Sequence, residues 1–232
     1  MLLWRWLVSR LVRHKLVRGK PVMQLALDML SIDEALRIAG LVAPFFEVLE
    51  VGTPLMFSEG VRAIEALRSR YPEKTILADM KIADAGDYEA VMAFDAGADL
   101  VSVLGVVDPR TIEGAVGAAK RRGGGVVIDT LNVPDLDSSV SKFERLGAAC
   151  IEIHAGTDQA HDASDLVGRV GAAVSQIGIP VAVAGGLSPN NVGLLTTTGA
   201  TVFVVGSSVT RANDPMKVAM DFRVVLHRGE HV

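Results

Sequence analysis

Cysteine is nearly absent from this chain. Cys150 is the only cysteine among the 232 residues, so no disulfide bond can form within the chain. Its neighbours Ala149 and Ile151 are apolar, and we expect Cys150 to be a small buried core residue and not a nucleophile. The lack of disulfides excludes a small disulfide-stabilised secreted domain and predicts a cytoplasmic protein.

An apolar run long enough to cross a membrane is also lacking. Residues 1–20 contain both tryptophans, but six Lys or Arg residues interrupt their apolar positions, whereas a transmembrane helix needs roughly 20 apolar residues. No small-residue cleavage site follows, so secretion is not expected. The segment could form a basic amphipathic helix on a membrane or a partner. We favour a poorly ordered extension over residues 1–22 without membrane contact, followed by a catalytic domain over residues 23–232.

Aromatic residues are scarce, at 5% of the chain, while half of the residues are hydrophobic and Gly, Ala and Val recur throughout. This composition is typical of parallel α/β proteins, whose strands are buried on both faces, and it excludes a disordered or fibrous chain. Without the six basic residues of the first 20 positions, 17 of the 23 basic residues remain against 27 acidic ones, a formal charge of −10. We expect no nucleic-acid partner.

Eight short apolar runs alternate with helical patterns in the rest of the chain. The stretches 32–41, 60–69, 88–96 and 111–120 have apolar residues at the spacing of amphipathic helices. The apolar runs, interpreted as strands, are 24–28, 47–52, 75–81, 99–105, 125–131, 150–156, 180–186 and 201–207. Eight βα units predict a single closed (β/α)8 TIM barrel of the α/β class. An open doubly wound sheet has the same alternation, but no G-x-G-x-x-G follows the first strand, which weakens its dinucleotide-binding form.

Polar residues stand at the ends of these otherwise apolar strands, where the active sites of such barrels lie. They are Asp28, Glu50, Asp79, Lys81, the nearby Asp84, Asp129 and His154. Alternation along the third strand places Asp79 and Lys81 on the side of the barrel mouth, with Ala78 and Met80 toward the helices. Because buried charges need partners, we predict a catalytic cluster of Asp79, Lys81 and Asp84, with a buried ion pair without chemistry as the alternative.

Two of these groups, Glu50 and Asp79, are carboxylates at the ends of adjacent strands. Oxygen ligands of this kind suit Mg²⁺, which takes its remaining ligands from water and substrate. An isolated rim charge is the alternative for Glu50. His154 is either a satisfied core histidine or a proton carrier, because histidine titrates near neutral pH.

Glycines and hydroxyl groups follow the last two predicted strands. Gly185 and Gly186 follow the seventh strand, and Gly206 and Ser207 follow the eighth. Many barrels bind phosphate at these positions through backbone N–H groups and a short helix N-terminus. One glycine pair alone would indicate a tight turn, but the two together predict a phosphorylated ligand.

The segment ILADMKIADAGDYEA, residues 76–90, contains a D-x-K-x-x-D core and resembles the orotidine-phosphate decarboxylase suprafamily. The resemblance extends from about Gln24 to Val225. Within that suprafamily, several further stretches are most similar to the 3-hexulose-6-phosphate synthase family. These stretches are LALD, EVGTP, VSVLGVVDPRTIEGAVGAAK, VIDTLNV and HAGTDQA.

A sister family, 3-keto-L-gulonate-6-phosphate decarboxylase, shares KIADAG with this chain. Three features favour the synthase family: Asp129 where the decarboxylases have a glutamate, Thr157 where they have an arginine, and the Val-Leu-Gly of residues 103–105. The loop VGSSVTRAND, residues 205–214, departs from the Gly-Gly that is typical of the synthases. The departure lies in the predicted phosphate site, because this loop contains Gly206 and Ser207.

The synthase resemblance implies an aldolase that condenses formaldehyde with D-ribulose 5-phosphate, reversibly, to give D-arabino-3-hexulose 6-phosphate through an enediolate. It implies Mg²⁺ held by Glu50 and Asp79, removal of a C1 proton by His154, and stabilisation of developing oxyanions by Lys81. It further implies a homodimer with active sites at the interface, in which Asp84 is contributed by the neighbouring subunit.

The resemblance assigns Asp28 and Asp129 to the orientation of Lys81 and of substrate hydroxyl groups. Two alternatives use the same barrel: the decarboxylase reaction, and a non-catalytic barrel that binds sugar phosphates. A binding module would need only the phosphate loops, so the polar strand ends favour an enzyme.

Overall fold

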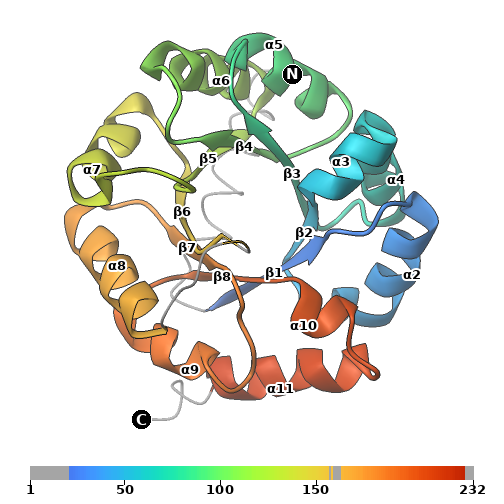
Figure 1. Cartoon of the computed structure of the whole chain (residues 1–232). Coiled ribbons are helices and arrows are strands. Elements are labelled where there is room, and N and C mark those ends of the chain that lie inside the picture. The colour runs from blue at the N-terminus through green and yellow to red at the C-terminus, as the bar shows by residue number, and fades with distance from the viewer. Residues whose placement is uncertain (1–20, 157, 159–162, 228–232) are drawn as a thin grey trace.

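Eight parallel strands close into a barrel in the order of the sequence, with helices around the outside (Figure 1). The structure is a computed structural model, and it describes residues 21–156, 158 and 163–227. The first strand pairs with both the second and the eighth, which excludes an open sheet. The predicted (β/α)8 barrel is confirmed.

The strands overlap the eight predicted apolar runs. They are β1 (Val22–Leu27), β2 (Val48–Val51), β3 (Thr75–Ile82), β4 (Leu100–Leu104), β5 (Gly125–Asp129), β6 (Cys150–His154), β7 (Val181–Ala184) and β8 (Val202–Val205). The long helices are α2 (Ile32–Val42), α4 (Val61–Arg70), α5 (Gly86–Asp95), α6 (Pro109–Arg122), α7 (Leu136–Leu146), α8 (Ala163–Gln176) and α11 (Pro215–His227). Shorter helical segments are η1 (Ala43–Phe45), α3 (Thr53–Glu59), α9 (Val192–Leu195), η2 (Thr196–Thr198) and α10 (Ser207–Thr210). The pattern of the sequence did not predict α3 and α10, which directly follow β2 and β8.

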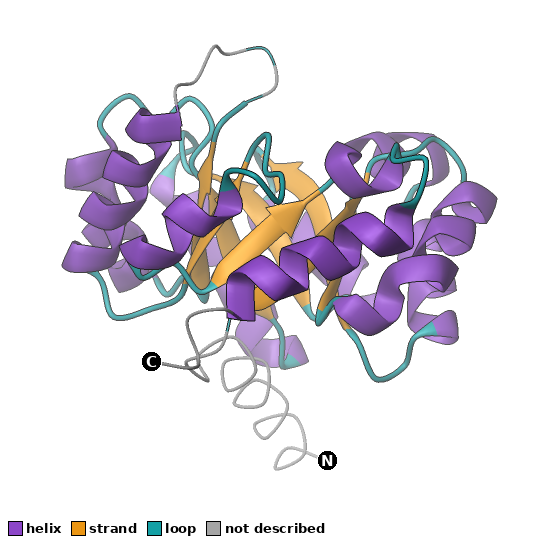
Figure 2. Cartoon of the chain, turned by 90° about the horizontal axis from the view of Figure 1, so that it is seen from below, coloured by secondary structure: helices purple, strands orange, loops and turns teal. Residues whose placement is uncertain are grey.

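Apolar side chains form two concentric layers. An inner layer fills the barrel and includes Leu77, Leu100 and Cys150, while an outer layer between strands and helices includes Phe203 and Phe222. In the side view the helices flank the strands (Figure 2). Cys150 is 2% exposed, and burial raises the pKa of its thiol, so it is the core residue that the sequence predicts.

Local sequence signals set the ends of helices. The Asp108 carboxylate accepts a hydrogen bond from the backbone N–H of Arg110, and Pro109 occupies the first position of α6. Gly147 ends α7 with a φ of 101°, a left-handed conformation that glycine adopts readily. The chain then enters β6 directly, and this strand ends at His154.

Residues 1–20, which make up most of the predicted extension, lie outside the described residues, and β1 begins at Val22. None of the helices in the described part of the chain combines the length and the apolarity that a bilayer crossing requires.

Candidate active site

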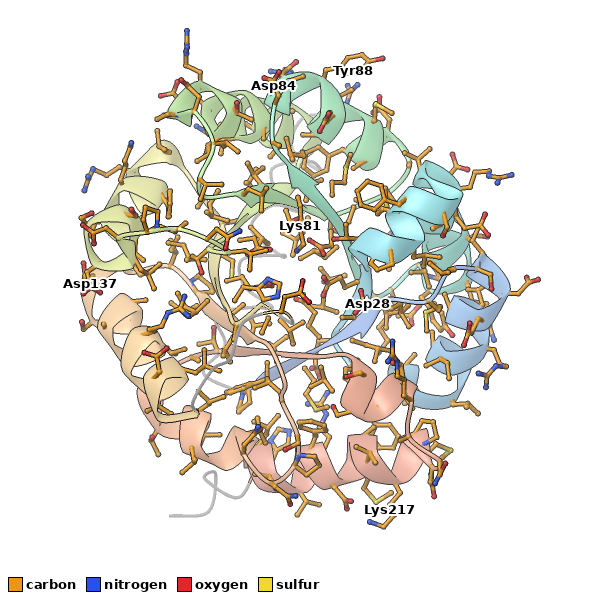
Figure 3. All side chains as sticks on the ribbon, viewed as in Figure 1. Asp28, Lys81, Asp84, Tyr88, Asp137 and Lys217 are labelled. Atoms are coloured by element: carbon orange, nitrogen blue, oxygen red, sulfur yellow. The ribbon has the colours of Figure 1, made fainter. Side chains whose placement is uncertain are left out.

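A cavity of about 710 Å³ lies at the C-terminal ends of the strands. Most of the predicted site residues line it: Asp28, Glu50, Asp79, Lys81, His154, Gly185, Gly186, Gly206 and Ser207. Asp129 contacts Lys81 of the cavity wall, whereas Asp84 lies elsewhere. Figure 3 shows Lys81 and Asp28 pointing into the barrel mouth and Asp84 on the outer rim.

A bulge in β3 sets the position of Lys81. Between Ala78 and Ile82, β3 has two more residues than the facing part of β4. Lys81 has a φ of 46°, which is uncommon for a residue with a side chain. Its backbone N–H donates a hydrogen bond to Oγ of Ser102 at 2.8 Å. Alternation thus predicted the correct side of the barrel for Lys81, but a bulge and not a regular pleat places it there.

The Lys81 ammonium group bridges two carboxylates. Its Nζ lies 2.7 Å from Oδ2 of Asp129 and 3.1 Å from Oδ1 of Asp79. Burial alone would lower the pKa of Lys81, but the charges of Asp79 and Asp129 outweigh it and raise the pKa. Lys81 is therefore a cation at physiological pH.

Asp129 also contacts the imidazole of His154, whose Nδ1 lies 3.0 Å from Oδ2 of Asp129. Burial would raise the pKa of Asp129, but the hydrogen bond from His154 and the charge of Lys81 lower it to about 2. An ionised carboxylate only accepts hydrogen bonds, so Nδ1 carries the hydrogen and Nε2 has the free lone pair. His154 lines the cavity, so this lone pair can act as a base there and the residue is not a buried core histidine.

Neighbouring hydroxyl groups fix the Asp79 carboxylate. Ser102 donates a hydrogen bond to Oδ1 at 2.7 Å, and Thr53, the first residue of α3, donates to Oδ2 at 2.5 Å. The unpredicted helix α3 therefore contributes to the site through its first side chain. Asp79 is buried at 8% exposure, and hydrogen bonds from Ser102, Thr53 and Lys81 hold its carboxylate.

Glu50 is buried at 6% exposure and accepts one hydrogen bond, from Nε2 of Gln24 at 2.7 Å. Burial and the nearby charge of Asp79 raise the pKa of Glu50 to about 8. Burial and the same charge also raise the pKa of Asp28. Acidic side chains outnumber basic ones in the lining of this cavity, and the oxygen donors of Glu50 and Asp79 fit a hard divalent cation such as Mg²⁺.

The far end of the cavity is formed by the loops after β7 and β8. Gly185 has a φ of 113°, and a Cβ atom at this position would lie 2.3 Å from the carbonyl oxygen of Ala155. Only glycine allows this close approach. Gly186 and Gly206, which have no side chains, line the cavity with their backbone. Arg211, which was not predicted from the sequence, follows α10 and lines the same cavity. Its position shortly after Gly206 in the VGSSVTRAND loop is the feature of the sequence that could have indicated a role in this site.

Glu152 is a second site residue that the sequence analysis missed. It lies on β6, two residues before His154, and is 7% exposed. Burial and the charges of Asp129, Glu50 and Asp79 raise its pKa well above the ordinary value. Alternation within Cys150–His154 places Glu152 and His154 on the same face, so the pattern already contained this signal.

Asp84 does not join the cluster within one chain. It is exposed and lines a separate shallow groove with Tyr88, Asp108 and Arg110. Thr157, which stands where the decarboxylase family has an arginine, lies outside the described residues. The site that a single chain forms thus contains Asp79 and Lys81 without Asp84.

Known proteins are similar to this chain in sequence and in fold. The sequence profile of the orotidine 5'-phosphate decarboxylase / HUMPS family matches residues 21–222. A 3-hexulose-6-phosphate synthase of Mycobacterium gastri is 42% identical over 205 residues, which cover 88% of this chain and 99% of that protein.

Two solved structures are also similar. The crystal structure of 3-hexulose-6-phosphate synthase from Salmonella typhimurium has a TM-score of 0.83 and 41% identity, with 88% of this chain and 98% of that chain covered. The structure of KGPDC, 3-keto-L-gulonate-6-phosphate decarboxylase, from Streptococcus mutans in complex with D-R5P has a TM-score of 0.83 and 26% identity, with 90% and 98% covered.

Proposed function

The chain belongs to the orotidine 5'-phosphate decarboxylase / HUMPS family, and on this basis we propose that it is a 3-hexulose-6-phosphate synthase. The proposed reaction condenses formaldehyde with D-ribulose 5-phosphate, reversibly, to D-arabino-3-hexulose 6-phosphate. The observation that carries the proposal is the position of Asp129, which contacts both Lys81 and His154. Together these groups can remove a proton next to a carbonyl group and stabilise the negative charge that results.

The proposed cofactor is Mg²⁺, with Glu50 and Asp79 as the residues that would hold it. When bound, it would supply Lewis-acid stabilisation of negative charge on substrate oxygens. The excess of carboxylates in the cavity and the raised pKa of Glu50 support a cation at this place. Gln24, Thr53 and Ser102 hold the two carboxylates by hydrogen bonds, as expected of groups that orient metal ligands.

The proposed base is Nε2 of His154, which removes the C1 proton of ribulose 5-phosphate. The Asp129 carboxylate stabilises the imidazolium through the Nδ1 hydrogen, and the Lys81 ammonium group stabilises the negative charge on the enediolate oxygens. The C1 carbon then forms a bond to formaldehyde, and the former carbonyl oxygen of formaldehyde takes up a proton. Asp129 thus acts by positioning the two residues that face the substrate.

The phosphate group of the substrate is proposed to bind between the loops after β7 and β8. The exposed backbone of Gly185, Gly186 and Gly206 offers N–H donors, and Ser207 adds a hydroxyl group. Arg211 adds a cation that can pair with phosphate oxygens, and its presence offsets the loss of Gly-Gly in this loop. The cavity volume of about 710 Å³ is within the range of small-molecule sites.

A homodimer with active sites at the interface completes the proposal, with Asp84 reaching the site of the neighbouring subunit. Exposed large apolar side chains support an interface, and one of them, Tyr88, lines the same groove as Asp84. Phe57 of α3 is 86% exposed and Tyr88 of α5 is 71% exposed. Apolar groups of this size on a surface commonly mark a contact between proteins.

An assay with both candidate substrates tests this proposal. The purified protein is incubated with Mg²⁺, ribulose 5-phosphate and formaldehyde, and in parallel with 3-keto-L-gulonate 6-phosphate under CO₂ detection. We expect formaldehyde consumption that EDTA abolishes and added Mg²⁺ restores. Release of CO₂ without formaldehyde consumption would instead assign the decarboxylase reaction to the same residues. No detectable activity in either assay would favour a binding module.

A further inference from the structure

Glu152 differs from the other buried carboxyl groups of the cavity in its contacts. Glu50 accepts a hydrogen bond from Gln24, and Asp79 and Asp129 each have several donors. Within the described residues, the only donor in contact with the Glu152 carboxyl group is Nδ1 of His154, at 3.5 Å from Oε1. That nitrogen has one hydrogen, and it points to Asp129 at the shorter distance of 3.0 Å. Glu152 therefore lacks a hydrogen-bond partner from the described protein.

The position of Glu152 makes this lack of partners informative. Its side chain is more than nine-tenths buried, at 9% exposure, and it lines the cavity next to His154. Its backbone is in register with Asp129 of β5 and Ala182 of β7, so the carboxyl group stands beside an ionised carboxylate in the barrel interior. A buried polar group without a partner costs about 1–3 kcal/mol. A ligand that supplies the partner removes this cost when it binds.

The charges around Glu152 determine which kind of partner fits. Burial and the charges of Asp129, Glu50 and Asp79 raise its pKa well above the ordinary value, which favours the neutral acid, the form with an O–H to donate. A neutral carboxylic acid in an enzyme cavity is an effective hydrogen-bond donor to substrate oxygens.

A cation is the other ligand that three such side chains could accept. Ligand atoms of Asp129, Glu152 and His154 lie within 4.8 Å of one another. However, Nζ of Lys81 already lies 2.7 Å from the Asp129 oxygen that faces His154. A metal ion at this place would have to displace the ammonium group, so the contacts favour a neutral ligand oxygen over a second cation.

We propose that Glu152 is a further substrate-binding residue, whose carboxylic acid O–H donates a hydrogen bond to a hydroxyl or carbonyl oxygen of the sugar phosphate. This inference rests on the proposed function, because it needs a polyhydroxylated ligand in the cavity. It assigns to β6 two residues with different tasks: His154 moves a proton, and Glu152 holds an oxygen.

Substitutions of similar size separate a neutral donor from an ionised group. Glu152→Gln keeps a neutral donor of nearly the same shape, and Glu152→Met keeps the volume without a donor. We expect Glu152→Gln to bind ribulose 5-phosphate about as the wild type does, and Glu152→Met to bind it roughly tenfold or more weakly. Binding is measured by calorimetry with ribulose 5-phosphate in the presence of Mg²⁺, and thermal unfolding confirms the fold; Glu152→Ala replaces the Met variant if that variant does not fold.

A control and the contrary outcomes complete the test. Cys150→Ala changes the same inward face of β6 outside the cavity lining, and it should bind ribulose 5-phosphate like the wild type. Equal binding by Glu152→Met and the wild type would overturn this inference alone. Loss of binding in Glu152→Gln as large as in Glu152→Met would show that the ionised form acts, which also overturns it. A wild type that does not bind ribulose 5-phosphate would overturn the proposed function itself.

Discussion

Nζ of Lys81 lies 2.7 Å from Oδ2 of Asp129, although the two residues are 48 positions apart in the sequence. The contact joins the bulge of β3 to the last residue of β5. The same oxygen atom lies 3.0 Å from Nδ1 of His154. One carboxylate oxygen therefore orients both the cation and the base of the proposed reaction.

Removal of this charge should affect the chemical step. In Asp129→Asn, the amide cannot balance Lys81, and it no longer holds the Nδ1 hydrogen of His154 in place. We expect kcat to fall roughly 10²- to 10⁴-fold, with unchanged circular dichroism. Asp129→Glu is the matched control because it keeps the charge and shifts it by one methylene group. Steady-state kinetics should show a smaller loss for the glutamate variant, and equal losses would mean that the charge of Asp129 is not what matters.

The sequence predicted the barrel and most of the cavity because these depend on local patterns. Strand ends are visible as polar residues after apolar runs, and in a parallel barrel all of them meet at one face. The bulge at Lys81 could not be predicted, because it depends on the register between β3 and β4. Asp84 belongs to the same D-x-K-x-x-D motif as Lys81, but it lies on the outer rim. The spacing of a motif does not specify the direction that the loop after the strand takes.

Glu152 and Arg211 show which site residues the sequence pattern can and cannot predict. Glu152 could have been found by alternation from His154, but a glutamate inside an apolar strand is hard to distinguish from one that faces a helix. Arg211 comes after a helix of four residues that the apolar pattern does not reveal. Its approach to the cavity results from the path of the chain after β8.

Magnesium binding should depend on pH through Glu50. Its pKa of about 8 in the folded chain lies above the ordinary 4.5, so the folded state holds this proton more tightly than the unfolded state. The associated stability is fully present below pH 4.5 and is lost as the pH rises toward 8. Mg²⁺ needs the ionised carboxylate, so its affinity should rise up to about tenfold per pH unit below pH 8.

Thermal unfolding checks this prediction. The increase in Tm on addition of MgCl₂ should be larger at high pH than at low pH, and Glu50→Gln should abolish it. A matched concentration of chloride added as NaCl controls for ionic strength. An increase that is equal at both pH values, or that persists in Glu50→Gln, would assign the cation to other ligands.

Arg211 should contribute to substrate binding more than to the chemical step. In Arg211→Gln the phosphate end of the cavity loses its cation, so we expect KM for ribulose 5-phosphate to rise about 10- to 100-fold with little change in kcat. Competitive inhibition by inorganic phosphate should weaken in parallel. Lys217→Gln removes the same charge from an exposed side chain of α11 that pairs with Asp221, and its kinetics should match the wild type. If both variants behave alike, the phosphate is held by the backbone alone.

The proposed interfacial site predicts complementation between two inactive variants. Lys81→Ala destroys the site of its own chain, and Asp84→Ala destroys the site of the neighbouring chain. A mixed dimer then has one site with both defects and one intact site. Random mixing in equal amounts makes half of the dimers mixed, so activity should recover to about a quarter of the wild-type value.

The measurement is the formaldehyde-dependent rate of each variant alone and after co-refolding, with the double variant Lys81→Ala/Asp84→Ala as the control. The double variant should stay inactive when mixed with either single variant, because every site then has at least one defect. Asp84 lies in a groove outside the cavity of its own chain, so a contribution within one chain requires a change in the loop after β3. Recovery near a quarter places Asp84 in the partner's site, whereas an active Asp84→Ala protein or the absence of recovery from properly folded mixed dimers contradicts a shared site.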